Sequence, residues 1–392
     1  TGLISLGSVV RIHSPLPKRM LNLKKTLQKY FKLTGYFLFK VLYGRIVGTV
    51  NAESESGIKV DLIKKNDKSS YRIYKIDKGR LYTDGVSDTA IIKNKKIIDG
   101  PSFQFRTINS EVINTSANKN LVFLNGTPRF QKKINGKVMS LLTGGAGNEN
   151  YWHWMFDVLP RFGICEDLVN LDTIDFFLVP DNRKKFQIET LEILKIPKNK
   201  QISSAKFRHI LAEELYLTSH PVALSDNSTE SILKIPGWIS KWLKKKFVNK
   251  NLKNTKNFSK KIYLDRSDSK SNVKSLRSVI NEEELKNHLL NEGFKFVKLA
   301  DLHFKDQVMT FNEADIIVGL HGAGFANMPF SKPNTKIIEL KANPLDDVIK
   351  NLAIKNNLIH KSIDCALDEV KPHNQFGHVR VPMEELDRIL KV

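Results

Sequence analysis

An apolar strand runs directly into a glycine-rich turn at Ile316-Ile317-Val318-Gly319-Leu320-His321-Gly322-Ala323-Gly324-Phe325-Ala326-Asn327. Glycines let the backbone turn tightly and approach a ligand, and amides that open a following helix would face an anion. A nucleotide diphosphate suits such a turn, and the alternative is a strand-to-helix turn with glycine for geometry alone. The order of the glycines differs from the dinucleotide fingerprint, so NAD binding is not predicted.

Strands and helices alternate on both sides of this turn. The spacing predicts strands over residues 261–264, 294–299, 315–318 and 336–340, and a helix over residues 303–314. Another helix is expected after Asn281 as its N-cap, with Glu284 completing a capping box and Gly293 ending it; its apolar positions are Leu285, Leu289 and Leu290. This alternation indicates an open α/β half.

A similar alternation precedes it. Strands are expected over residues 137–142, 175–179 and 214–217, with helices over 151–159 and 184–194 and glycines at 144–147 after the first strand. A helical stretch with Trp238 and Trp242, followed by the polar run 250–261, is taken as the boundary between the halves. Ligands of open α/β sheets bind beyond the carboxyl ends of the strands, so the site is expected between the two halves.

The first hundred residues follow other patterns. Short β-like runs at 71–76, 80–82 and 90–92 predict a small antiparallel appendage. Residues 18–43 are basic with apolar positions at helical spacing, which suits a helix on an anionic membrane leaflet or one docked on its own domain. The expected domains are 1–45 (basic helix), 46–245 (acceptor side, with the appendage) and 246–392 (nucleotide-sugar side). Whether the last helix returns to the N-terminal domain stays open.

Composition limits the classes of protein to which the chain can belong. A chain of 392 residues is longer than one hydrophobic core usually organises, and 41% of its residues are hydrophobic. The sequence has no apolar run of about 20 residues, the length that a membrane-spanning helix needs. Cys165 and Cys365 give neither a disulfide framework nor a zinc-ligand set. We expect a cytoplasmic protein that is soluble or peripheral on the inner membrane face. Because the sequence starts at Thr1, a native leader before it remains an alternative.

The formal charge of +22 fits nucleic acid, an anionic membrane surface or phosphate-bearing substrates. Heavy use of lysine along the whole chain is the compositional alternative to a selected basic face. The chain shows no zinc-finger, helix-turn-helix or aromatic-sheet signature, so we do not expect nucleic acid as a partner.

A second chemical motif is Asn150-Tyr151-Trp152-His153-Trp154-Met155-Phe156-Asp157. His153 and Asp157 are four residues apart, so on a helix they share one face and could form a base with its orienting carboxylate. The alternative is a core helix with a hydrogen-bonded histidine. At the end of the strand 261–264, Arg266 could clamp a phosphate, and Glu339 could accept hydrogen bonds from ribose hydroxyls. Taken alone, each is equally consistent with an ordinary surface charge.

Several enzyme classes lack their signatures. The chain contains no Gly-x-Ser-x-Gly elbow, Walker loop, His-Glu-x-x-His or Cys-x-x-Cys. An Asp-x-Asp pair, which many transferases use to hold a metal, is also missing from the sequence.

The motifs together resemble the family sixty-one glycosyltransferases. The resemblance rests on Tyr151-Trp152-His153-Trp154 with Asp157, Ile262-Tyr263-Leu264-Asp265-Arg266, Asn281-Glu282, His321-Gly322-Ala323-Gly324 with Asn327, and Ile338-Glu339-Leu340. It implies an inverting enzyme of the GT-B fold, two facing Rossmann-like domains, acting on a sugar nucleotide. The family includes eukaryotic N-acetylglucosaminyl- and xylosyltransferases and bacterial capsular or exopolysaccharide proteins. Family members often carry an Arg pair before Asn-Glu, and here only Arg277 stands nearby.

The expected site follows from these motifs and the resemblance. Asp157 is the first choice for the catalytic base and His153 the second, and Asn150, Tyr151 and Trp152 are expected at the acceptor. The donor is assigned to Arg266, Arg277, His321, Gly322, Ala323, Gly324, Asn327 and Glu339. No cofactor and no metal are expected, because Arg266, backbone amides and a helix dipole could stabilise the leaving pyrophosphate.

The expected function is transfer of a sugar from a nucleotide donor to a glycan or lipid-linked acceptor in cell-surface polysaccharide synthesis. A basic nucleic-acid-binding protein and an inert GT-B scaffold that binds glycans remain the alternatives. The sequence does not identify the sugar, the acceptor or the oligomeric state.

Overall fold

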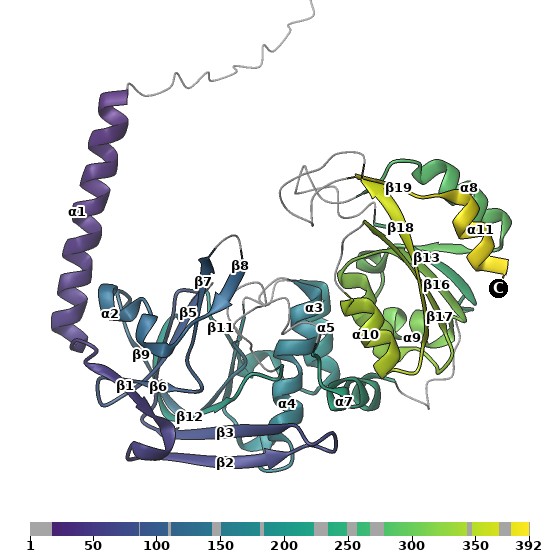
Figure 1. Ribbon diagram of the computed structural model, residues 1–392. Helices are drawn as coiled ribbons and strands as arrows, with labels where there is room; N and C mark the ends of the chain where they lie inside the picture. The colour runs from purple at the N-terminus through teal and green to yellow at the C-terminus, as the bar shows by residue number, and fades with distance from the viewer. Residues whose placement is uncertain are drawn as a thin grey trace, which may run out of the picture.

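The protein is described from a computed structural model, which covers residues 18–85, 87–108, 111–142, 150–180, 184–222, 234–248, 257–266, 278–342, 347–367 and 378–391. Within these residues the chain forms two β-sheets with helices packed around them (Figure 1). The expected α/β class is confirmed. The Gly144–Gly147 turn and Arg277 lie outside the described residues.

The larger sheet has twelve described strands, and its main path runs β1-β6-β5-β4-β12-β9-β10-β11. The strands are β1 Gly48–Asn51, β2 Ile58–Lys64, β3 Ser70–Asp77, β4 Arg80–Thr83, β5 Asp88–Lys93, β6 Lys96–Asp99, β7 Phe103–Ile108, β8 Glu111–Asn114, β9 Lys132–Ser140, β10 Phe176–Val179, β11 Gln201–Ser203 and β12 His209–Thr218. Four neighbouring strands, β12-β9-β10-β11, are parallel. β12, the last of these four along the chain, therefore lies beside β9, the first of the four.

The expected appendage is not a separate unit. β12 is long enough to pair antiparallel with β4 through His209 and with β3 through Glu214 on one edge, while its other edge pairs with β9. The predicted antiparallel strands therefore continue the parallel ones in a single sheet. Local sequence patterns predict each strand, but they do not show that β12 joins the antiparallel and parallel strands in one sheet.

The smaller sheet has the order β14-β19-β18-β17-β16-β13-β15. Its strands are β13 Lys261–Leu264, β14 Ser278–Val279, β15 Lys295–Val297, β16 Ile316–Leu320, β17 Lys336–Ala342, β18 Ile359–Leu367 and β19 His378–Arg380. The consecutive parallel strands β15-β13-β16-β17-β18 follow the doubly wound order 2-1-3-4-5. In that order, strands are added first to one side of β13 and then to the other, so the strand order reverses between β13 and β16.

The helices surround these sheets, and most of those expected from the sequence are present. They are α1 Lys18–Tyr43, α2 Val122–Asn125, α3 Tyr151–His153, the π-helix η4 Trp154–Val158, α4 Pro160–Cys165, α5 Lys185–Ile193, α7 Gly237–Phe247, α8 Glu282–Asn291, α9 Phe304–Glu313, the 3₁₀-helix η9 Ala323–Phe330, α10 Val348–Lys355 and α11 Met383–Lys391. Shorter 3₁₀ turns are η1 Ala52–Ser54, η2 Ala117–Lys119, η5 Leu171–Thr173, η6 Lys198–Lys200 and η8 Leu299–Asp301. No helix among the described residues is both long and apolar enough to span a membrane.

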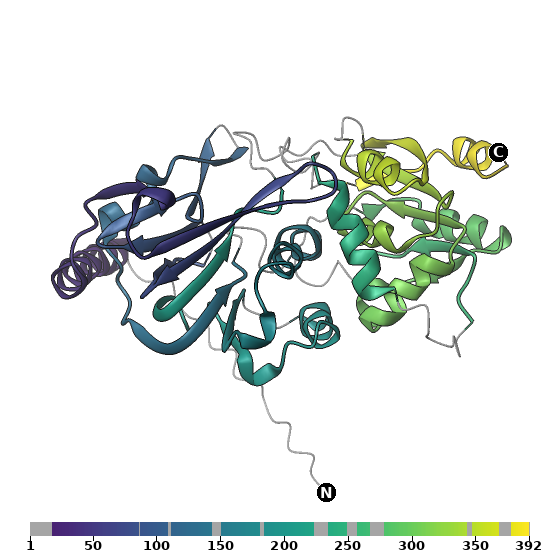
Figure 2. The same ribbon diagram turned by 90° about the horizontal axis from the view of Figure 1, so that it is seen from below.

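Helix α7 lies at the junction of the two halves (Figure 2). The indole of Trp238 donates to Tyr71 at 2.7 Å on the N-terminal side. At the other end, Phe247 packs edge-on against Phe304 and Phe330 of the C-terminal side. One apolar core consequently continues from the first sheet to the second.

The side-chain cap expected at the start of α8 is not formed. Asn281 makes no capping bond to its own helix; its amide instead donates to the carbonyl of Val381 and accepts from the Val381 amide, both at 2.9 Å. The last helix α11 does not return to the N-terminal half, because Leu386 is buried in the core of the second sheet. Of the apolar positions of α8, Leu285 and Leu289 are buried and Leu290 is exposed.

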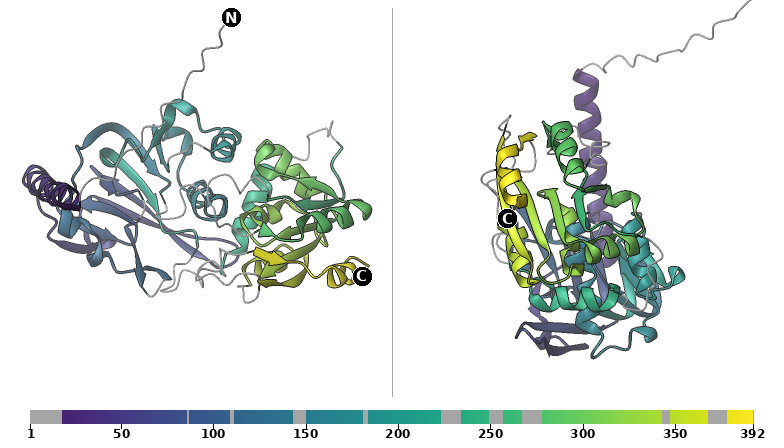
Figure 3. Two further views of the ribbon diagram at one scale, coloured as in Figure 1. Left: turned by 90° about the horizontal axis from the view of Figure 1, so that it is seen from above. Right: turned by 90° about the vertical axis from the view of Figure 1, so that its right-hand side faces the viewer.

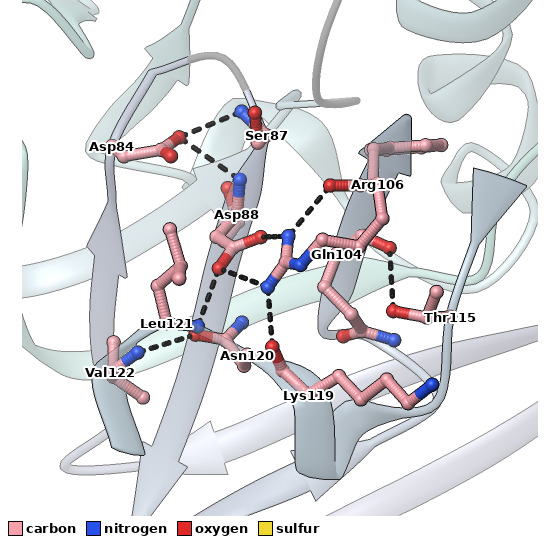
Figure 4. Close-up of polar contacts among 12 residues, drawn as sticks. Asp84, Ser87, Asp88, Gln104, Arg106, Thr115, Lys119, Asn120, Leu121 and Val122 are labelled. Carbon is pink, nitrogen blue, oxygen red and sulfur yellow. Dashed lines mark hydrogen bonds and ion pairs between the residues drawn. The ribbon is translucent and has the colours of Figure 1, made fainter. Parts of the chain in front are cut away.

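A buried ion pair fixes the hairpin β7-β8 region to the sheet (Figure 4). Arg106 donates to both oxygens of Asp88, at 2.6 and 3.1 Å, and Asp88 also accepts from the Leu121 amide at 2.6 Å. The hydrogen bond to Asp88 raises the pKa of Arg106. The pair ties three segments together and takes no part in the site described next.

Candidate functional site

The helix that carries the His153 motif changes type along its length. Asn150 caps α3 by accepting from the Trp152 amide at 2.9 Å. The next turn is a π-helix, in which the Leu159 amide donates to the carbonyl of Trp154 at 3.0 Å. Pro160 has no amide hydrogen to continue an α-helical ladder, which accounts for the wider turn. The sequence predicts one helix over residues 151–159, and the π-turn before Pro160 departs from that expectation.

His153 and Asp157 are joined by a hydrogen bond. Nδ1 of His153 lies 2.6 Å from Oδ2 of Asp157, and Nε2 of His220 lies 3.9 Å from the other carboxylate oxygen. Arg161 is buried below them and donates to the Asp157 backbone carbonyl at 3.0 Å and to the Thr218 hydroxyl at 3.1 Å. The acid is therefore surrounded by three nitrogen-bearing side chains.

These neighbours set the charge of the pair. Burial would raise the pKa of Asp157, but His220, His153 and Arg161 together hold it below its ordinary value. Burial lowers the pKa of His220 to about 4. Asp157 is accordingly a carboxylate that orients the His153 ring. Among the described residues, Nε2 of His153 has no hydrogen-bond partner.

The second part of the site follows β16 and is held by Glu339. This carboxylate accepts from Nδ1 of His321 at 2.5 Å and from Nε2 of His360 at 2.8 Å. Burial would raise the pKa of Glu339, but the two imidazoles hold it low. Each oxygen accepts from one imidazole, so Glu339 orients His321, and the ribose contact expected from the sequence stays a prediction.

Arg266 lies beside the same turn. Its guanidinium donates to the carbonyl of His321 at 2.8 Å, and a Cβ on Gly322 would stand 2.8 Å from its nearest nitrogen. Glycine at this position leaves room for the guanidinium. The amides of Ala323 and Gly324 open η9, where backbone N–H groups have no partner inside the helix. The amide of His321, in contrast, donates to Leu340.

Both parts lie at positions where the strand order of their sheets reverses. Arg266 follows β13 and His321 follows β16, the two strands that flank the reversal in the second sheet. In the first sheet, His220 follows β12 and the His153 helix follows β9, again neighbouring strands where the order reverses. Crevices outside such positions are the usual ligand sites of open α/β sheets.

A hydrogen bond connects the two parts. Tyr151 of α3 donates to Oδ1 of Asn327 in η9 at 2.6 Å, and the Asn327 amide donates to the Gly324 carbonyl at 3.1 Å. Burial raises the pKa of Tyr151. The bridge places the helix bearing His153 against the turn that follows His321.

Three residues expected to touch ligands have other surroundings. Asn327 is fully buried in the bridge. Trp152 is buried with its ring 4.7 Å from that of Phe156, and Tyr151 packs edge-on against Phe186. These aromatic rings build the wall that carries His153, and the acceptor contacts expected of Tyr151 and Trp152 stay predictions.

Comparison with known proteins addresses the same segment. Residues 151–338 match the family model described as Glycosyltransferase 61. The match begins at Tyr151, spans His153, Asp157, Arg266 and His321, and ends next to Glu339. It supports a glycosyltransferase. No curated protein sequence matches the chain.

The candidate site contains residues that the sequence motifs did not predict. Arg161 stands four residues after Asp157, so the spacing rule that paired His153 with Asp157 would have found it. His220 and His360 carry no local signal, since both reach the site through strand pairing. Among the described residues, no group of three or more His, Cys, Asp or Glu side chains could hold a metal ion.

Proposed function

We propose that this chain is an inverting glycosyltransferase that moves a sugar from a nucleotide donor to a glycan or lipid-linked acceptor without a divalent metal. We place it in cell-surface polysaccharide synthesis, on the resemblance alone. The arrangement proposed is GT-B, with the acceptor on the N-terminal half and the nucleotide on the C-terminal half. The observation that carries the proposal is the pairing of Arg266 and His321 across the reversal between β13 and β16.

The leaving pyrophosphate needs its developing charge stabilised. Arg266 supplies a fixed positive charge beside Gly322, and the amides of Ala323 and Gly324 supply dipoles from the start of η9. Glu339, which also accepts from His360, holds the His321 ring in one orientation. These groups are proposed to do the work that a metal does in transferases with an Asp-x-Asp pair.

The acceptor hydroxyl must lose a proton on the opposite side of the sugar. We assign the base to His153, with Asp157 as its orienting carboxylate, in place of the order expected from the sequence. Asp157 has one oxygen bonded to His153 and the other facing His220, whereas Nε2 of His153 points away from that bond. A histidine held by a carboxylate can accept a proton from a hydroxyl.

The proposal is tested with a panel of nucleoside diphosphates and sugar nucleotides in thermal-shift measurements. A ligand that binds only the folded chain raises its melting temperature. We expect a shift with one class of sugar nucleotide, and transfer from that donor that persists in EDTA. Activity lost in EDTA and restored by manganese would contradict the metal-free mechanism. No shift with any nucleotide would favour an inert scaffold.

A further inference from the structure

Within the described part of the chain, helix α1 touches other elements only near its C-terminal end. The ring of Tyr43 packs edge-on against His209 at 4.8 Å, and its hydroxyl accepts from the Gln131 amide at 2.9 Å. Phe39 contacts Phe130 at 5.2 Å between ring centroids, and Lys40 donates to the carbonyl of Leu124. The preceding turns extend away from the sheet (Figures 1 and 3). Of the two expectations for this segment, docking on its own domain holds for the last turns alone.

The opposite side of α1 is apolar and exposed. An α-helix turns by about 100° per residue, so the residues on the side away from Phe39 and Tyr43 can be assigned from their spacing. They form the outer face of α1, which consists of Leu27, Tyr30, Phe31, Phe37, Leu38 and Val41. All six are exposed, Phe31 to 83% and Val41 to 70%. Soluble monomers rarely present such a continuous apolar stripe without a partner.

Charge identifies the kind of partner. α1 has no Asp or Glu, and its basic residues are Lys18, Arg19, Lys24, Lys25, Lys29, Lys32 and Lys40. The exposed Lys25, Lys29 and Lys32 lie away from the outer face. An apolar face with aromatic residues and a lysine-rich polar face is typical of a helix in the membrane interface. A second copy of α1 fits poorly, because two such helices bring together only positive charges.

We propose that α1 binds the surface of an anionic lipid membrane, with its outer face among the acyl chains and its lysines near the lipid phosphates. The docked end, held by Tyr43 and Phe39, then keeps both sheets beside the bilayer. The proposal does not depend on the transferase activity, since it uses no residue of the candidate site.

The test is co-sedimentation of the full chain with vesicles of phosphatidylcholine alone or mixed equally with phosphatidylglycerol. We expect binding to the mixed vesicles that weakens in high salt. Phe31→Gln with Leu38→Gln should reduce partitioning about tenfold or more, because two apolar side chains no longer enter the bilayer. Lys25→Gln, Lys29→Gln and Lys32→Gln together should reduce it by roughly fivefold per lysine.

The matched control is Leu62→Gln with Leu290→Gln, two leucines as exposed as Leu38 but on β2 and α8. This control should bind vesicles like the native chain, and unchanged melting temperatures should show that every variant folds. Failure of the native chain to bind anionic vesicles, or equal binding by the outer-face variant, would overturn the proposal. So would a dimer in sedimentation velocity that becomes a monomer in the outer-face variant, since a second copy would then cover this face.

Discussion

At the scale of single residues, Asp157 controls the tautomer and orientation of His153. Asp157→Asn keeps the shape but removes the negative charge that faces Nδ1. We expect turnover to fall by roughly 10²–10⁴-fold with nucleotide affinity almost unchanged. Steady-state kinetics and calorimetry measure the two effects. Glu166→Gln is the matched control, because Glu166 pairs with Lys246 and is outside the site; native turnover in Asp157→Asn would remove the pair from the mechanism.

Glu339 predicts a pH-dependent contribution to stability. Its folded pKa lies below its ordinary value, so its charge stabilises the fold above the unfolded pKa, and this is lost as the pH falls through the folded pKa. Glu339→Gln should cost about 2–4 kcal/mol at pH 7, and the difference from the native chain should shrink below about pH 4. Denaturant unfolding across that range measures it. Glu53→Gln, whose partner Arg72 is exposed, should cost less than about 1 kcal/mol, and a pH-independent gap for Glu339→Gln would contradict the assignment.

Residue chemistry was predictable where neighbours are close in sequence. His153 with Asp157 follows from helical spacing, and Arg266 from its place after a strand. The partners of Glu339 could not be found in that way. His360 lies on β18, and its approach to Glu339 depends on the pairing of β17 with β18. Functional roles assigned to polar residues from motifs alone, such as Asn327, cannot distinguish a ligand contact from a buried structural bond.

At the scale of elements, the contact between α4 and α7 depends on Gly163. A Cβ on Gly163 would stand 2.8 Å from the indole nitrogen of Trp242, whose ring is held by a 3.1 Å bond to Glu166. Gly163→Ala should therefore destabilise the fold by roughly 1–3 kcal/mol through overpacking. Gly237→Ala, at the start of α7 with open space around it, should be neutral or slightly stabilising. Equal unfolding free energies for the two variants would contradict this packing.

Element prediction succeeded where period and length agreed. The strand at residues 261–264 has the bounds expected, because a short apolar run follows a polar one. The helix after Asn281 exists, but the cap does not, since Val381 from the far end of the half competes for the asparagine amide. Similarly, the π-turn at Trp154–Val158 depends on how Pro160 is accommodated within a buried helix.

At the scale of the whole molecule, hydrogen bonds and one continuous core connect the two halves, and the bond from Tyr151 to Asn327 joins the two parts of the site. Tyr151→Phe removes the hydroxyl that donates to Asn327 and leaves the buried Oδ1 of Asn327 without this hydrogen bond. We expect a loss of about 1–3 kcal/mol in unfolding free energy, together with lower turnover. Tyr216→Phe is the control, because its 2.8 Å bond to Glu214 stays within one strand. Native stability and turnover in Tyr151→Phe would show that the bridge does not hold the site together.

The larger architecture was the least predictable part. Two α/β halves follow from alternation, but the merging of the antiparallel strands with the first half depends on β12. The apolar core shared through α7 is likewise a product of tertiary packing between Trp238, Trp242 and Phe247 and both halves.

The central claim is that nucleotide binding and proton transfer belong to opposite halves. Calorimetric titration of the donor nucleotide into Arg266→Ala and His153→Ala, with turnover of the same variants, tests it most directly. The account predicts that Arg266→Ala weakens nucleotide binding by roughly 2–5 kcal/mol, whereas His153→Ala keeps native affinity and loses turnover. Native nucleotide affinity in Arg266→Ala, or a loss of affinity in His153→Ala, would contradict it.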